Sequence, residues 1–262
     1  MTAVITAENL GYHFSQPPTT ALSGVSFAVE QGQFVAIVGP NGSGKTTLVK
    51  LLLGLLNPTE GRVMVAGKEP REARLEVLRN IGYVPQHESV NAQVPVAVRD
   101  VVAMAAQCRY DGALSRKEVR RRVQESLEMV ELGDLAGRAF GALSGGQQQR
   151  ALIARALVVD PYILVADEPF NRVDAASHQN IIDLLQRLSK EKHVTVLVVV
   201  HNINPLVHYL DRVLLLNTEM VTYGTPADAL TPSYLLEAYG KVVPILVCEE
   251  GFLHPLTEGQ HG

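Results

Sequence analysis

This 262-residue chain has few cysteines, no long apolar run and no excess of basic residues. Its two cysteines, Cys108 and Cys248, lie far apart and match no metal-binding spacing, which favours a reducing compartment. Apolar runs such as 194–200 are far shorter than the roughly 18–20 residues that cross a membrane. The first residues lack a basic segment followed by an apolar one, so we expect no signal peptide. A net charge of -4 argues against nucleic acid as the main partner. We therefore expect a soluble protein that acts at a membrane only through a partner.

The most specific feature present is a glycine-rich segment between a predicted strand and a predicted helix. Residues 34–38 (FVAIV) are typical of a buried parallel strand, and residues 46–53 have a helical pattern. Residues 39–46 (GPNGSGKT) fit the phosphate-binding pattern G-x-x-x-x-G-K-[ST]. Glycine lets the backbone turn its N–H groups toward phosphate oxygens, and the following helix N-terminus favours anions. A glycine-rich turn with a chance lysine is the alternative, and the flanking strand and helix disfavour it. The predicted nucleotide contacts are Gly39, Pro40, Asn41, Gly42, Ser43, Gly44, Lys45, Thr46 and Thr47.

A second predicted strand ends in two carboxylates. Residues 163–168 (ILVADE) run from apolar side chains into Asp167 and Glu168. The carboxyl ends of parallel strands collect ligands, so these carboxylates are expected beside the phosphate loop. Asp167 would orient Mg²⁺, which the Thr46 hydroxyl would also bind, and Glu168 would polarise the attacking water as general base. An ordinary Asp-Glu pair at a strand end is the alternative, and the phosphate loop disfavours it.

The remaining pattern divides the chain into three parts. Residues 1–38 contain short strands, with a loop at 15–20, and residues after 156 alternate strands with helices around a parallel sheet. The pattern is helical at about 87–156. There, Ser115 and Glu118 form a predicted capping box before an amphipathic helix. The arginines on that helix indicate a solvated face more than a nucleic-acid site.

A five-residue segment restricts the nucleotide-binding protein to one superfamily. Leu143–Gln147 (LSGGQ) resembles one superfamily, the ATP-binding-cassette (ABC) ATPases, and the resemblance covers residues from about 4 to 240. It implies an α/β fold with a P-loop NTPase (RecA-like) core, an N-terminal antiparallel β subdomain and an inserted α-helical subdomain. The ATPase domain would span 1–240, followed by a tail at 241–262. The motifs follow in the family's order: Gly39–Thr46, Gln86, Leu143–Gln147, Asp167-Glu168, Asp174 and His201.

The resemblance also implies roles for single residues. His201, which directly follows the strand 194–200, matches the switch histidine that would hydrogen-bond the γ-phosphate of ATP. Gln86 would contact Mg²⁺ or the attacking water and couple the site to a membrane partner. Phe14 would stack on adenine, with Tyr12 as the alternative on the other face of the strand. Asp174 is retained from the D-loop, although residues 171–172 depart from the commoner Ser-x-Leu-Asp form.

The signature segment implies a dimer. A serine hydroxyl and glycine N–H groups at the start of a helix, which we place at Gln147 onward, form a second anion cradle. In the family this segment closes over the γ-phosphate bound by the opposite subunit, so a second copy of the chain would complete each site. The residues concerned are Ser144, Gly145, Gly146 and Gln147.

Softer signals point to one branch of the superfamily. Segments 81–86, 94–102, 147–150, 167–170, 214–217 and 231–240 resemble the ATPase subunits of zinc and manganese importers. This branch implies ATP hydrolysis at the cytoplasmic face of the inner membrane, driving divalent metal uptake through a separate permease fed by an extracytoplasmic solute-binding protein. An importer of an iron chelate or another solute, an exporter subunit, a regulatory module and a non-transport ABC ATPase are the alternatives. The tail carries Cys248, His254 and His261, so a metal-sensing tail is a further hypothesis beside a plain surface extension.

Overall fold

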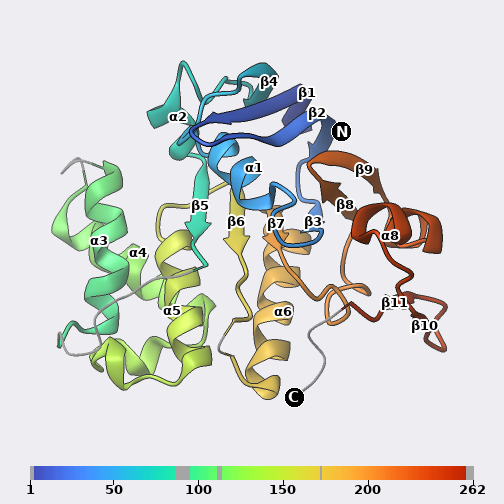
Figure 1. The fold of residues 1–262 in the computed structure, drawn as a ribbon. Coiled ribbons are helices and arrows are strands. Elements are labelled where there is room, and N and C mark those ends of the chain that lie inside the picture. Colours follow the sequence, from blue (N-terminus) through green and yellow to red (C-terminus); the bar gives the residue numbers. More distant parts are fainter. Residues whose placement is uncertain (1–2, 87–94, 111–113, 172, 258–262) are drawn as a thin grey trace.

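A six-stranded sheet forms the centre of the computed structural model, which describes residues 3–86, 95–110, 114–171 and 173–257 (Figure 1). Its strand order is β5-β6-β7-β3-β8-β9, and all neighbours are parallel except β8 and β9. Parallel strands need crossover connections, and the helices supply them. The strands are β5 Ile81–Val84, β6 Ile163–Asp167, β7 Thr195–Val199, β3 Phe34–Val38, β8 Arg212–Asn217 and β9 Glu219–Gly224.

Alternate side chains of this sheet enter two separate cores. Ala36 and Val38 of β3 face a core shared with the large helices, whereas Val35 and Ile37 face a second core. The second core also contains α1 (Lys45–Leu52) and the N-terminal strands. Because both faces are covered, the strands are apolar without a polar alternation, which explains the continuous apolar runs in the sequence.

A smaller antiparallel sheet covers the side of the central sheet that carries α1 (Figure 1). It has the order β2-β1-β4, from β1 (Ala3–Ser15), β2 (Pro18–Glu30) and β4 (Glu60–Val65). The prediction of a loop at 15–20 is wrong in extent: β1 continues to Ser15 and β2 resumes at Pro18. A proline is compatible with the first residue of a strand, so the turn needs only two residues.

Three helices form a group beside the sheet: α3 (Val98–Tyr110), α4 (Arg116–Met129) and α5 (Gly145–Leu157) (Figure 1). Ser115 caps α4 by accepting the Glu118 N–H at 3.2 Å. Glu118 does not reach back as the capping box predicted. Its carboxylate instead accepts hydrogen bonds from Arg121 and Arg122, which lower the pKa of Glu118 to about 2.

Further elements lie around the central sheet (Figure 1). They are α2 (Arg74–Leu78), α6 (Ala175–Lys190), α7 (Pro226–Ala229), α8 (Pro232–Tyr239), and a C-terminal hairpin of β10 (Ile245–Val247) and β11 (Leu253–Pro255). Among the residues that the structure describes, no helix has both the length and the apolar character to cross a membrane.

Candidate functional site

The register of the central sheet brings the predicted catalytic groups to one edge. Ile37 of β3 and Asp167 of β6 both pair with Val199 of β7, so the three strands end together. The Glu168 N–H then donates to the Val199 carbonyl at 2.9 Å. The phosphate loop, the two carboxylates and His201 follow these ends directly, as expected at the carboxyl edge of a parallel sheet.

The phosphate loop needs glycine for both conformation and space. Gly39, Gly42 and Gly44 have φ values of 154°, 78° and 96°. A Cβ at Gly39 would come within 3.0 Å of the Leu216 carbonyl, and one at Gly44 would clash equally with β2, whereas Gly42 has open space around it. The sequence therefore forms this loop only with glycine at 39 and 44, and its N–H groups open onto the first turn of α1.

Lys45 is the charged centre of the loop. Its ammonium donates to the carbonyls of Gly39 and Pro40 at 2.9 and 2.8 Å, and the residue is buried. Burial lowers the pKa of Lys45 below its usual value, while the nearby charges of Glu168 and Asp167 oppose that shift. A buried cation between carboxylates and an N–H-lined loop can neutralise a polyphosphate.

Glu168 lies at the centre of a polar cluster. The Gln86 amide donates to its Oε2 at 2.6 Å, the Asn171 amide donates to the same oxygen, and His201 Nε2 pairs with Oε1. The residue itself has a positive φ of 51°, which is unfavourable for glutamate and common at functional sites. Three side chains therefore hold one nearly buried carboxylate in place beside the phosphate loop.

Gln86, Glu168 and His201 share one cavity of about 380 Å³ with the phosphate loop. Phe14 is 41% exposed at its mouth, and Tyr12 packs edge-on against Phe14 with its own ring against the core. This arrangement suits Phe14, rather than Tyr12, as a stacking surface for a flat ligand. The cavity is lined by Phe14, Thr19, Thr20, Ala21, Asn41, Gly42, Ser43, Gly44, Lys45, Thr46, Thr47, Gln86, Glu168 and His201.

The donors around this cavity fit Mg²⁺. Thr46 offers an exposed hydroxyl on the first turn of α1, and Asp167 offers a carboxylate at the end of β6. Gln86 adds an amide oxygen from the cavity wall. Mg²⁺ prefers oxygen ligands and commonly binds beside phosphates. The residues predicted as magnesium ligands are therefore compatible with this ion.

The LSGGQ segment does not line this cavity. Its helix, α5, begins at Gly145, two residues before the predicted start, and Ser144 and Gln147 form a reciprocal capping box with it. The N–H groups of Gly145 and Gly146 therefore belong to the first turn, where a helix attracts anions. The N-terminus of α5 and the phosphate loop are therefore two separate features of the chain, each favourable to an anion.

Packing ties this segment to the D-loop. Gly146 abuts the Ser177 side chain, and a Cβ at 146 would lie within 3.0 Å of it. Ser177 in turn hydrogen-bonds Asp174, whose Oδ1 accepts the Ser177 N–H at 3.0 Å and whose Oδ2 accepts the hydroxyl at 2.8 Å. Asp174, predicted to contact nucleotide, thus caps α6.

Asn171 is the functional candidate that the motif pattern alone did not assign. Its departure from the common D-loop form was the only signal in the sequence, and its contact with Glu168 appears only in three dimensions. Arg172, the other unusual residue there, lies outside the described residues.

Comparisons with known proteins agree with this geometry. The ABC transporter family matches residues 22–171. The manganese transport system ATP-binding protein MntB of Halalkalibacterium halodurans is 38% identical over 91% of this chain and 93% of its own length. The zinc transport system ATP-binding protein TroB of Treponema pallidum is 39% identical over 90% and 86%. A bacterial ABC transporter cassette solved as a dimer is 33% identical, with a TM-score of 0.72 over 84% of this chain and 98% of that one.

The fold and the site define a P-loop NTPase, as predicted. The chain belongs to the ABC transporter family, and it is an ABC ATPase with the α/β cassette fold that the motif order implied. The resemblance inferred from its motifs is thereby confirmed.

Proposed function

We propose that this chain hydrolyses ATP to power uptake of a divalent metal ion, of the zinc or manganese class, through a separate membrane permease. The main support for ATP hydrolysis is the position of the Glu168 carboxylate, which Gln86 and His201 hold in the cavity beside the phosphate loop. The curated relatives named for manganese and zinc transport support the choice of substrate.

Each residue of the cavity has its own proposed role in binding or hydrolysing ATP. Lys45 and the loop N–H groups hold the phosphates, and Phe14 stacks on the base. Glu168 accepts a hydrogen bond from the attacking water and polarises it, and His201 binds the γ-phosphate. Mg²⁺, held through Thr46 and Asp167, supplies charge neutralisation on the β- and γ-phosphates when bound.

A second copy of the chain is part of the proposed site. The first turn of α5 and the phosphate loop are separate anion-binding features, so a head-to-tail pair places each loop opposite the other copy's Ser144–Gln147 segment. A dimeric relative with the same fold supports this arrangement. Its cassette has also been solved in a dimeric post-hydrolysis state with ADP and Pi, at a TM-score of 0.70 and 33% identity.

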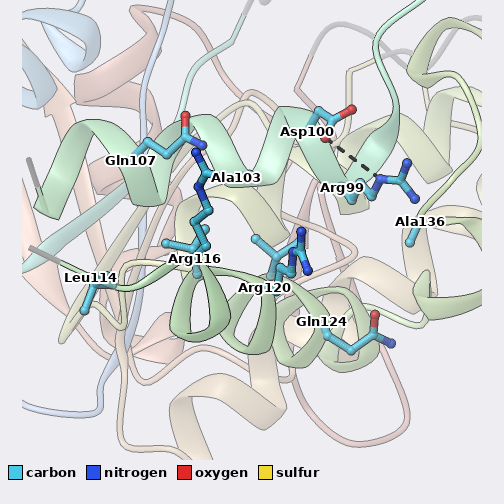
Figure 2. Close-up of a pocket in the computed structure, with 11 residues that line it drawn as sticks. Arg99, Asp100, Ala103, Gln107, Leu114, Arg116, Arg120, Gln124 and Ala136 are labelled. Atoms are coloured by element: carbon cyan, nitrogen blue, oxygen red, sulfur yellow. Dashed lines mark ion pairs between the residues drawn. The ribbon is translucent and has the colours of Figure 1, made fainter. Parts of the chain in front are cut away.

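The permease is proposed to dock on the helical part of the cassette, at about 87–156 within an ATPase domain spanning 1–240. A cavity of about 900 Å³ opens between α3 and α4, with Ala103, Val119 and Val123 among its apolar residues. Figure 2 shows the Arg116 side chain extending from α4 toward Gln107 of α3. The same lining includes Arg99, Arg116 and Arg120, and apolar residues beside arginines suit a permease segment at the cytoplasmic membrane surface. An extracytoplasmic solute-binding protein would deliver the metal to that permease.

Metal uptake by intact cells tests the proposal. Cells lacking the gene are complemented with the wild-type chain, with Lys45→Ala or with the matched surface variant His193→Asn, and uptake of radioactive zinc and manganese is measured. We expect uptake of one metal to return with the wild type and His193→Asn but not with Lys45→Ala. Equal uptake of both metals in all strains would contradict the proposed substrate class.

A further inference from the structure

Two segments far apart in the sequence bring three metal-ligating side chains together. His208 lies between β7 and β8, whereas Cys248 and His254 belong to the C-terminal hairpin. One ligand atom from each residue lies within 4.8 Å of those from the other two. The cluster is distinct from the nucleotide site, since none of its members lines the phosphate-loop cavity.

The register of the hairpin places Cys248 and His254 on the same face. Leu246 is opposite His254, and the Cys248 N–H donates to the Phe252 carbonyl at 3.2 Å. Because side chains alternate along a strand, residues 246, 248, 252 and 254 share one face of the hairpin. Cys248 and His254 are therefore diagonal neighbours, within reach of one ion.

His208 is held facing them by its own neighbours. Its Nδ1 pairs with Glu250 Oε2 at 2.9 Å, and its ring lies 4.4 Å from the Phe252 ring and 5.3 Å from the His254 ring, centre to centre. A carboxylate on one imidazole nitrogen commonly orients the other nitrogen toward a metal. Glu250 thus leaves Nε2 of His208 as the ligand atom.

His254 contains a buried polar atom that the chain does not satisfy. Its Nε2 is inaccessible and, within the part of the chain that the structure describes, has no hydrogen-bond partner. Cys248 beside it is a half-buried free thiol. Buried imidazole nitrogens are normally bonded, so an atom of this kind next to a thiol and a second imidazole indicates a ligand.

We propose that His208, Cys248 and His254 bind one Zn²⁺. A thiolate with two imidazoles suits Zn²⁺, whereas Mn²⁺ and Mg²⁺ prefer oxygen ligands. Zinc–ligand bonds of about 2.0–2.3 Å require the three atoms to approach to roughly 3.3–3.6 Å of one another, which is a small contraction from the present separations of up to 4.8 Å. Binding deprotonates the Cys248 thiol, and the proton is released to solvent. A water molecule completes the fourth position.

The ion would fasten the tail to the segment that follows His201. Besides the His208–Glu250 pair, that contact includes two hydrogen bonds: Asn204 donates to the Pro255 carbonyl at 3.1 Å, and the Thr257 hydroxyl donates to the His201 carbonyl at 3.5 Å. His261, the third ligand of the predicted metal-sensing tail, lies outside the described residues, and His208 takes its place in this proposal.

Metal titration of the untagged full chain tests the site. The reduced protein is titrated with Zn²⁺, Mn²⁺ and Co²⁺ in excess Mg²⁺, which occupies the nucleotide site. We expect one Zn²⁺ per chain, much weaker Mn²⁺ binding, and a thiolate-to-cobalt charge-transfer absorption with Co²⁺. Cys248→Ser and His254→Gln should each weaken Zn²⁺ binding by at least about tenfold.

Two matched variants serve as controls: Cys108→Ser, which removes the other cysteine, and His193→Asn, which removes an exposed histidine. Both should bind Zn²⁺ as the wild type does. Wild-type protein without a thiolate–cobalt band, or Cys248→Ser protein with unchanged zinc affinity, would overturn the proposal. The cobalt band is measured on the wild type, so the test does not depend on the variants folding. None of the three proposed ligands lines the nucleotide cavity, so zinc binding can be tested separately from the proposed ATP hydrolysis.

Discussion

Gly146 provides a sharp test of how the signature segment is built. Helix propensity alone predicts that Gly146→Ala in the first turn of α5 stabilises the protein by up to about 1 kcal/mol. The structure predicts the opposite sign, because the new Cβ would lie within 3.0 Å of the Ser177 side chain. Ser177 is held in place by its two hydrogen bonds to Asp174, so it cannot move away freely. Overpacking of this kind costs about 1–3 kcal/mol, so after subtracting the helix-propensity gain the middle of that range leaves a net loss of about 1 kcal/mol.

Thermal unfolding followed by circular dichroism measures this loss. For a chain of this size, we expect this loss to lower the Tm of Gly146→Ala by roughly 2–4 °C. Gly133→Ala is the matched control, since a Cβ there meets its nearest side-chain atom at an ordinary 3.4 Å. The second change Ser177→Gly should restore about 1 kcal/mol in a double-mutant cycle. A Gly146→Ala protein as stable as the wild type would refute the packing argument.

Three further predictions concern the phosphate loop and the D-loop. Gly39→Ala should abolish nucleotide binding, measured with a fluorescent ATP analogue. Gly42→Ala, where a Cβ would meet open space, should lower the nucleotide affinity only about tenfold. Equal losses of affinity in the two variants would contradict the steric account. Asp174→Ala removes the cap of α6 and should cost about 1 kcal/mol in urea unfolding, and an unchanged midpoint would show that the cap contributes nothing. Asn171→Ala should lower kcat roughly ten- to hundredfold with KM unchanged, because Glu168 loses a positioning bond, and Asn171→Ser should partly restore it. A rise in KM alone would assign Asn171 to binding.

Local rules predicted the core of the nucleotide site. The run 34–38 is β3, the strand 163–167 is β6, and the loop between β3 and α1 has the expected glycine conformations. These features depend on neighbours in the sequence: an apolar run, a turn and a helix start. For that reason they could be read before any contact was known.

Individual side-chain contacts, whether within a helix or between distant segments, could not be predicted in this way. Glu118 was predicted to cap its own helix. Its carboxylate instead accepts hydrogen bonds from two arginines on the next turn, and these charged donors bind it more strongly than a backbone N–H would. His208 has no sequence signal that joins it to Cys248 and His254, because folding of the C-terminal hairpin brings them together. The contact of Asn171 with Glu168 likewise depends on how the chain turns after β6.

The most direct test of the central claim is the oligomeric state and turnover of Glu168→Gln with ATP. The amide keeps the shape of the side chain and removes the general base, so kcat should fall at least about a hundredfold while ATP binding persists. Size-exclusion chromatography with ATP should then show a stable dimer, which separates into monomers when ATP is withdrawn. A Glu168→Gln chain that hydrolyses ATP and stays monomeric would contradict the account.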